Sequence, residues 1–276
     1  MLLVYSIIAI TLILSMKAFN DRLFLNRSIF HVDQILRFNQ KDRLISSGFI
    51  HADWIHFAMN MYVLHMFADM ALSAISALSF VLLYLSALIG GNLLALLMHK
   101  NEPNYRALGA SGAVSGIVFL AIILYPFGSM GLIFIPFLRL PSWIFGLIYI
   151  VYTIYAAKKN MGNVGHSAHL GGAIIGLIGA AILVPEALQA HPYIYFMILI
   201  PCVVFLFVEA KAHTILNLGG NPFKERTLKD KHHRSNDINP KIERQQELDK
   251  LLDKVAQKGI EGLSKEDKER LDELSK

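Results

Sequence analysis

The chain is poor in charged residues and contains a single cysteine. Only 17% of its 276 residues are Asp, Glu, Lys or Arg, and Cys202 lies in an apolar run. One cysteine cannot form a disulfide within the chain, and there is no paired CxxC motif, phosphate-binding glycine loop or dinucleotide fingerprint. We therefore expect no cofactor. The net charge is +5, but the basic residues form no continuous tract, which argues against a nucleic-acid partner.

Hydrophobic residues dominate the composition instead. They make up 54% of the chain, and the mean hydropathy is +0.46, as is typical of a polytopic membrane protein. The charges gather at one end, since residues 221–276 hold 14 of the 26 Lys and Arg and 13 of the 21 Asp and Glu. We predict an all-α chain with a membrane helical bundle over 1–212, a polar linker over 213–238 and a small soluble helical hairpin over 239–276.

Seven apolar runs predict membrane-spanning helices. The first begins almost at Met1, with no basic region ahead of it and no convincing cleavage site, so we expect a retained helix rather than a signal peptide. The segment between the first two runs is expected to lie on the membrane surface, and residues 126–141 to form a re-entrant or surface connection. The seven expected spans are 2–19, 54–72, 76–98, 111–125, 142–157, 166–184 and 191–210.

A lone serine stands among small residues at the head of the fourth run. The stretch 109–116 reads GASGAVSG. As a helix from Ser111, this run has about fifteen residues and a length of about 22 Å, against about 30 Å for a bilayer core. Ser111 would then lie below one membrane surface, at the floor of a wet cavity, with Gly109, Gly112 and Gly116 allowing close backbone approach. Alternatively, Ser111 is one small residue in a packed helix interface.

The sixth run begins with a histidine followed by glycines. On a helix, His169, Gly172 and Gly176 share one face. The histidine is therefore followed by a face of small residues, against which another helix can pack closely. The short fourth helix has a matching face of glycines. Packing the two faces together brings His169 to the level of Ser111, which would pair a nucleophile with a base.

Three polar side chains lie at the start of the second run. His56 and Asn60 are four residues apart and share a helix face, and His51 precedes them. Polar groups at membrane depth need partners, and an imidazole or a carboxamide can simply form hydrogen bonds between helices. From these residues alone, a structural role in hydrogen bonds between helices and a catalytic role are both possible.

Together, the three motifs resemble those of the rhomboid intramembrane serine proteases. GASG at 109–112, AHxxGxxxG beginning at Ala168 and HxxxxHxxxN beginning at His51 occur in the family's order and cover most of residues 40–185. The resemblance implies a six-helix core, here with a seventh helix added. It also implies cleavage of transmembrane protein substrates within the lipid bilayer.

The resemblance also implies a role for each motif residue. Ser111 would be the nucleophile, His169 the general base and acid, and His56 and Asn60 the oxyanion donors beside the Ser111 backbone N–H. Peptide hydrolysis needs these three kinds of group. The residues expected to support them are His51, Gly109, Gly112, Gly172 and Gly176.

Two positions depart from the family's pattern. Asp42-Arg43 replaces its Trp-Arg pair, and the arginine keeps its place eight residues before His51. Ser115 replaces the aromatic residue that often follows the nucleophile by four positions and stacks under the catalytic histidine. Another side chain is then expected to support the His169 ring.

Three other functions fit less well. A zinc hydrolase could use His56, His166 and His169, but no carboxylate ligand or HExxH pattern is evident, so we expect no metal. An intramembrane aspartyl protease would need two Asp in mid-span, and Asp69 stands alone. A catalytically inactive rhomboid-fold protein that binds transmembrane clients would lack the serine or the histidine, whereas this chain has both.

The tail predicts two short helices. Asn239 and Pro240 fit the start of the first helix and Gly259 its end, while Ser264 and Asp267 fit the start of the second. These residues indicate no particular partner for the tail.

The expected location is the bacterial inner (plasma) membrane, as an integral multi-pass protein. Two arguments then conflict on its orientation. The loops on the catalytic side hold most of the Lys and Arg of the membrane part, so the positive-inside rule predicts that this side faces the cytoplasm. The resemblance implies that it faces the opposite side of the membrane.

Overall fold

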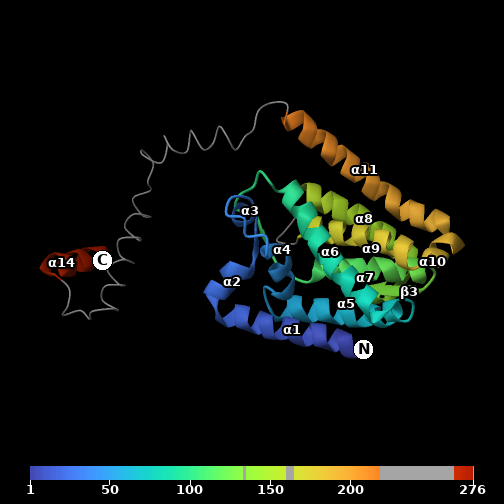
Figure 1. The fold of residues 1–276 in the computed structure, drawn as a ribbon, viewed down its shortest axis with the longest axis horizontal. Coiled ribbons are helices and arrows are strands. Elements are labelled where there is room, and N and C mark those ends of the chain that lie inside the picture. The colour runs from blue at the N-terminus through green and yellow to red at the C-terminus, as the bar shows by residue number, and fades with distance from the viewer. Residues whose placement is uncertain (133–134, 160–164, 218–263, 276) are drawn as a thin grey trace. The chain divides into compact units, whose positions relative to one another are not determined.

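The computed structural model describes residues 1–132, 135–159, 165–217 and 264–275. The chain divides into two compact units, Met1–Lys211 and Ala212–Lys276, which are described separately here. The first unit is a bundle of α-helices (Figure 1). In the second, one complete helix lies within the described residues, α14 (Lys265–Ser275).

Each predicted span corresponds to one helix. The predicted bounds are right to within two residues, except that the last helix continues to Asn217, into the predicted linker. Four of these helices (α1, α6, α9 and the Pro192–Glu209 part of α11) are long and apolar enough to cross a membrane, and the all-α polytopic class is confirmed. The number of spans stays a prediction. The seven helices are α1 (Leu2–Asn20), α5 (Trp54–Leu72), α6 (Ala77–Met98), α7 (Ser111–Leu124), α8 (Ser142–Lys159), α9 (His166–Leu183) and α11 (Pro192–Asn217).

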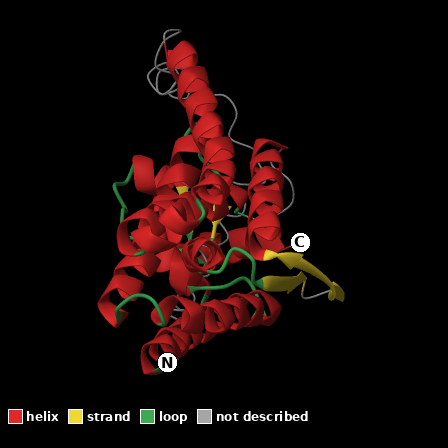
Figure 2. Cartoon of the chain, turned by 90° about the vertical axis from the view of Figure 1, so that its right-hand side faces the viewer, coloured by secondary structure: helices red, strands yellow, loops and turns green. Residues whose placement is uncertain are grey.

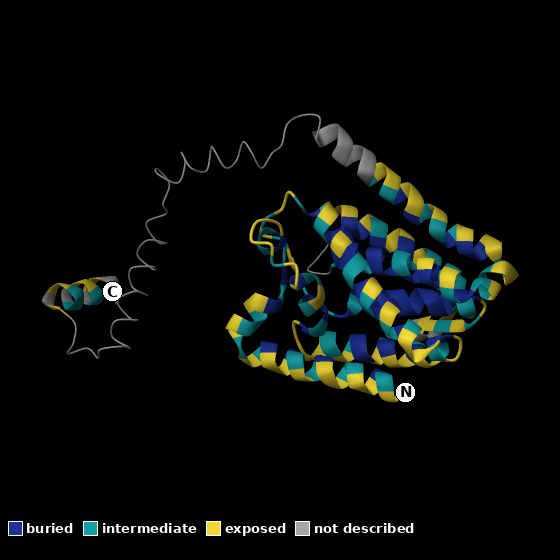
Figure 3. Cartoon of the chain, viewed as in Figure 1, coloured by how far each residue is buried: buried dark blue, intermediate teal, exposed yellow. Residues whose placement is uncertain are grey.

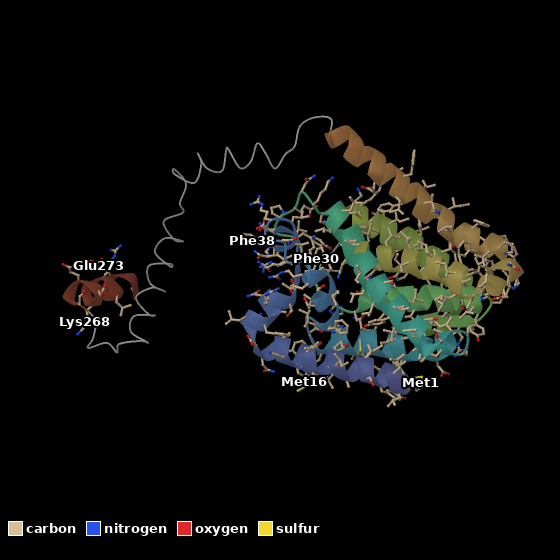
Figure 4. All side chains as sticks on the ribbon, in the orientation of Figure 1. Met1, Met16, Phe30, Phe38, Lys268 and Glu273 are labelled. Carbon is tan, nitrogen blue, oxygen red and sulfur yellow. The ribbon has the colours of Figure 1, made fainter. Side chains whose placement is uncertain are left out.

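The long segment between α1 and α5 is made of short elements. In chain order these are α2 (Arg22–Ser28), β1 (Phe30–His31), α3 (Val32–Leu36), α4 (Arg43–Ser46) and a single 3-10 turn, η1 (Ser47–Phe49). β1 pairs antiparallel with β2 (Arg106–Ala107), which lies in the loop between α6 and α7. Phe30 is fully buried, whereas Phe38 is 61% exposed (Figure 4). The β1–β2 pairing therefore joins the loop that leads to α5 with the loop that leads to α7.

The connection from α7 to α8 is a β-hairpin. β3 (Ser129–Leu132) pairs antiparallel with β4 (Ile135–Pro141), as Figure 2 shows. The sequence predicted a re-entrant or surface connection here but no strands. Its prolines argue only against a helix, and an apolar run of this length fits a strand or an inserted loop equally well. A short helix that was also not predicted, α10 (Pro185–Ala190), joins α9 to α11.

The core of the bundle surrounds α7. Every residue from 112 to 123 is buried, and α7 packs against α5, α6 and α9 (Figure 3). A helix that is apolar on all sides fits such a central position, because no face of it has to meet water. Its N-terminus, where Ser111 lies, is the point at which the polar loops reach the core.

The described part of the tail agrees with the predicted second helix. The Ser264 hydroxyl accepts a hydrogen bond from the Asp267 backbone N–H at 3.1 Å, so Ser264 caps α14 as predicted. The predicted first tail helix and residues 218–238 of the predicted linker lie outside the described residues.

Candidate active site

The turn before Ser111 depends on a glycine. Gly109 has φ of +121°, and a Cβ added there would lie 2.7 Å from Cε1 of His56. A larger residue would therefore be strained and would also push against that ring. The Gly109 backbone N–H donates to the Ser47 carbonyl at 2.9 Å, which ties this turn to η1.

The glycine faces of α7 and α9 pack together, as the sequence suggested. A Cβ added to Gly172 would overlap the Gly112 carbonyl, and one added to Gly176 would lie 2.9 Å from the Gly116 Cα. The two backbones are therefore in direct contact, an arrangement that membrane helices reach through small residues.

This contact brings Ser111 and His169 together. His169 Nε2 lies 2.6 Å from Ser111 Oγ, a hydrogen-bond distance that suits proton transfer between the two groups. Near His169, the His166 ring lies edge-on at 6.0 Å between centroids, and it in turn contacts Tyr152 of α8. The arrangement can therefore supply a nucleophile and its base.

His56 and Asn60 line the same cavity as Ser111 and His169. The Asp53 carboxylate accepts the His56 backbone N–H at 2.7 Å and so caps α5. The Asn60 side-chain amide donates to the His56 carbonyl at 2.9 Å. Both side chains line the cavity together with Ser111, and their role as oxyanion donors stays a prediction.

His51 contacts α1 and the turn before α7 and is not part of the cavity lining. Its Nε2 accepts the Ala110 N–H at 3.3 Å, and its Nδ1 lies 3.0 Å from the Ser15 hydroxyl of α1. Burial, followed by the nearby His56, lowers the pKa of His51 to about 3, although Asp53 opposes the shift. The ring is therefore neutral, and since Nε2 accepts, Nδ1 carries the proton and donates it to Ser15. His51 thus fixes the turn that precedes Ser111.

The first loop is anchored by Arg43 without the family's tryptophan. The buried Arg43 guanidinium donates to the Asn26 and Ile29 carbonyls, each at 2.7 Å, and to the Gln40 side chain at 2.8 Å. Burial and then the nearby Arg27 lower the Arg43 pKa, which nevertheless leaves an arginine charged. One side chain therefore joins the end of α2 to the residues just before α4.

Ser115, at the position of the family's aromatic residue, pairs with an aromatic side chain from another helix. Its hydroxyl lies 2.9 Å from the Tyr149 hydroxyl of α8. The sequence analysis missed Tyr149, since nothing in its local pattern shows which side of α8 faces α7. The phenol reaches α7 one helical turn beyond Ser111 and ties α8 to it.

A cavity of about 1710 Å³ runs from these groups along α5 and α8. Its apolar walls include Met59, Val63 and Met66 of α5 and Phe145 of α8, while Ser111 and His169 lie in its lining. Within the described residues, no three His, Cys, Asp or Glu come close enough to hold a metal ion.

Comparisons with known proteins agree with the three motifs. A family model described as the rhomboid domain matches residues 39–186, and one described as a family of unknown function (DUF6576) matches residues 232–276. RHOMBOID-like protein 12, mitochondrial, of Arabidopsis thaliana is 28% identical over 180 residues, which cover 60% of this chain and 53% of that protein.

Two further relatives match a shorter part of the chain. Rhomboid protein 1, mitochondrial, of Saccharomyces cerevisiae is 29% identical over 143 residues, 50% of this chain and 40% of that protein. Presenilin-associated rhomboid-like protein, mitochondrial, of Homo sapiens is 28% identical over 137 residues, 49% of this chain and 36% of that protein. The chain thus spans about half or less of the length of these curated relatives.

These matches correct one prediction and confirm another. All three relatives are mitochondrial by name, which contradicts the predicted bacterial plasma membrane. Composition and hydropathy identify a bilayer-spanning chain but carry no information on which membrane it enters. The rhomboid-domain match covers more than half of the chain and encloses the 40–185 interval of the motifs. The chain therefore belongs to the rhomboid family.

Proposed function

We propose that this chain is an intramembrane serine endopeptidase that hydrolyses peptide bonds in or near transmembrane segments of membrane proteins. The observation that carries the proposal is the 2.6 Å distance between Ser111 Oγ and His169 Nε2 in the cavity of a rhomboid-family chain. A Ser-His pair needs no third acidic residue when packing holds the ring in orientation.

The reaction runs in two halves. Ser111 Oγ attacks the scissile carbonyl carbon while His169 Nε2 takes the hydroxyl proton, and the imidazolium then gives that proton to the leaving amine as the C–N bond breaks. The product is an acyl-enzyme. Water then attacks the ester carbonyl, Nε2 takes one of its protons, and that proton returns to Oγ as the carboxylic acid leaves.

Negative charge on the carbonyl oxygen needs fixed donors. The Ser111 backbone N–H lies in the first turn of α7, where helical N–H groups have no partner within the helix. We propose the His56 ring and the Asn60 amide as side-chain donors, since both line the cavity with Ser111; Asn60 would exchange its bond to the His56 carbonyl for one to the oxyanion. One such donor is typically worth about 10² to 10³ in rate.

The cavity favours an apolar substrate segment. Its lining is rich in apolar side chains, among them Met59, Val63 and Met66 of α5 and Phe145 of α8, and it also includes Ser111 and His169. A transmembrane helix uses its carbonyl groups in its own hydrogen bonds, so the substrate has to unwind locally before Ser111 can attack. Substrates with helix-destabilising residues such as Gly near one end of their span should be cleaved best.

The test compares purified wild-type protein in liposomes with Ser111→Ala and His169→Ala variants, using a generic single-span substrate. Each substitution should abolish cleavage while the protein stays folded, because the two residues act as a unit. A fluorophosphonate should label the wild type at Ser111 and label His169→Ala far more slowly. Chelators should change nothing, which separates this mechanism from zinc hydrolysis.

Ser6→Ala and His191→Ala are matched controls. Ser6 bonds to its own helix on an exposed face of α1, and His191 contacts Phe127 and Tyr193, away from the cavity lining. Both variants should cleave at the wild-type rate. Undiminished cleavage by folded Ser111→Ala, or a wild type that binds transmembrane segments without cutting them, would refute the protease proposal and favour a client-binding protein.

A further inference from the structure

The helix that carries His169 has a glycine at its start. Gly165 occupies the N-cap position of α9, so the N-cap residue itself supplies no side chain to accept a hydrogen bond from the first turn. The ends of helices fray readily, because their first N–H groups have no partner within the helix. The distance between His169 and Ser111 depends on this turn, because His169 is only the fourth residue of α9.

A buried histidine from α6 holds this turn from the side. His99 directly follows α6 and is 4% exposed, and its Nε2 lies 3.0 Å from the Ser167 hydroxyl, on a residue that is 1% exposed. Ser167 and His169 are two positions apart, so they point to roughly opposite sides of α9. His99 therefore contacts the side of the turn that faces away from Ser111.

The His99 ring is itself fixed by its own loop. The Tyr105 ring stacks on it at 3.7 Å between centroids and 6° between planes. The Glu102 carboxylate lies 3.1 Å from Nδ1, close enough for an electrostatic contact but not aligned as a hydrogen bond. A carboxylate on this side favours a proton on Nδ1, which leaves Nε2 to accept the Ser167 hydroxyl proton.

Tyr105 connects this contact to the first loop. Its ring meets Phe30 edge-on at 6.1 Å, and its carbonyl accepts the Val32 N–H at 3.2 Å. The neighbouring residues form the β1–β2 pair. The ring under His99 is thus held by backbone and side chains that are buried or paired.

We propose that His99, Ser167 and Tyr105 form a clamp that holds the first turn of α9, so that His169 stays in reach of Ser111. They are positioning residues: all three lie in the lining of the cavity, but they act on the Ser111–His169 pair through the first turn of α9. The effect on rate rests on the proposed protease function, whereas the clamp itself does not. A displacement of about 1 Å in a catalytic group can cost about 10²-fold in rate.

Three substitutions separate the contacts of the clamp. His99→Phe keeps a ring for Tyr105 to stack on but removes both nitrogens. His99→Gln places a polar atom near the position of Nε2. Ser167→Ala removes one hydroxyl from a buried site and leaves the packing almost unchanged.

Two measurements are made on the full-length protein in liposomes. Hydrogen exchange of peptides covering residues 166–172 should rise at least about threefold in His99→Phe and Ser167→Ala, because the turn opens more often. Fluorophosphonate labelling of Ser111 and kcat should fall about tenfold or more, with KM changed by less than about twofold. His99→Gln should restore most of the protection from exchange and most of the labelling rate and kcat. The His99→Phe/Ser167→Ala double variant should differ little from either single variant in these quantities, because both substitutions remove the same hydrogen bond.

His191→Phe and His191→Gln are the matched controls. This histidine also contacts two aromatic rings, those of Phe127 and Tyr193, but it lies at the other end of α9, beyond α10. Neither control should change exchange over residues 166–172 or the labelling rate.

The outcomes distinguish the clamp from the protease function. Unchanged exchange in His99→Phe and Ser167→Ala would overturn the clamp, and raised exchange with unchanged labelling would overturn its role in positioning His169. A His99→Gln variant as slow as His99→Phe would reject the hydrogen bond as the cause. A wild type that neither labels nor cleaves would reject the protease function, while exchange would still decide the clamp. If His99→Phe fails to fold, Ser167→Ala decides the same question.

Discussion

Two histidines of one motif take different positions in the structure. His51 is buried and bonded to the Ala110 N–H and to Ser15, whereas His56 lines the cavity together with Ser111. The spacing of the motif predicts that His56 and Asn60 share a helix face. It could not predict the partners of His51, because they come from α1 and from the loop before α7, which only the folded chain brings near.

We predict that His56→Ala and Asn60→Ala each lower kcat by about 10² to 10³ and change KM little, because the charge they meet exists only in the transition state. Steady-state cleavage in liposomes measures both constants. His65→Ala is the control on the same helix, since His65 stacks on Tyr5 and is absent from the cavity lining. An unchanged kcat in the His56→Ala/Asn60→Ala variant would remove both residues from the mechanism.

The sequence did not reveal the contacts whose partners come from other elements. The Arg43 guanidinium bonds to backbone carbonyls of the first loop, and Tyr149 bonds to Ser115. Backbone carbonyls carry no sequence signature, and the rotation of α8 about its axis is set by packing. The motifs therefore predicted that Ser111 and His169 lie together, but not which residues surround them.

At the scale of elements, small-residue patterns were more informative than apolar runs. The glycine faces of α7 and α9 predicted which helices would touch and at which level, because only small residues allow backbones so close. The apolar run between α7 and α8 gave no such indication. Its β3–β4 pairing depends on a register between two segments, which hydropathy alone does not specify.

We predict that Gly172→Ala destabilises the bundle and separates the dyad. The added Cβ would overlap the Gly112 carbonyl, a backbone atom that cannot rotate away, and such overpacking typically costs about 1–3 kcal/mol. Thermal unfolding in detergent should show a lower Tm, and fluorophosphonate labelling of Ser111 should fall with it.

Gly179→Ala, on the same helix, is the control for this prediction. A Cβ there would meet only the end of the Leu83 side chain, which can turn aside. This variant should keep its Tm within a few degrees, as about 0.5 kcal/mol or less is expected from a tolerated change. A Gly172→Ala protein as stable and as reactive as Gly179→Ala would show that the two helices are free to separate.

At the scale of the whole molecule, the orientation in the membrane is the open question. The first loop pairs much of its own charge, since Arg27 lies 2.7 Å from Asp42, Arg37 lies 3.0 Å from Asp33, and Arg43 is buried. Basic residues used in this way are structural parts of the loop. This pairing favours the orientation that the family resemblance implies, with the catalytic side away from the cytoplasm. A count of Lys and Arg alone would instead put that side towards the cytoplasm.

We predict that the first loop and the tail face the same side of the membrane, the side to which the active site opens. If the chain has the predicted seven spans, six of them separate the first loop from the tail, so the two lie on the same side of the membrane. In a Cys202→Ala background, Phe38→Cys and Glu266→Cys each add one thiol at an exposed position. An impermeant maleimide should label both in intact cells of a bacterial expression host.

Each pattern of labelling has a distinct meaning. Protection of both thiols in intact cells, with labelling after lysis, would show that loop charge sets the orientation. Labelling of only one thiol would show that the number of spans is not seven. Membranes opened with detergent provide the control that each cysteine can react.

The distance along the chain between Ser111 and His169 has a consequence for synthesis. The two residues are 58 positions apart, and the whole of α8 lies between them. A growing chain therefore inserts its serine well before the base that would activate it has been made. Under the proposed mechanism, Ser111 stays unactivated until α9 enters the membrane and packs against α7, so we predict that cleavage of other chains begins only once the bundle is nearly complete.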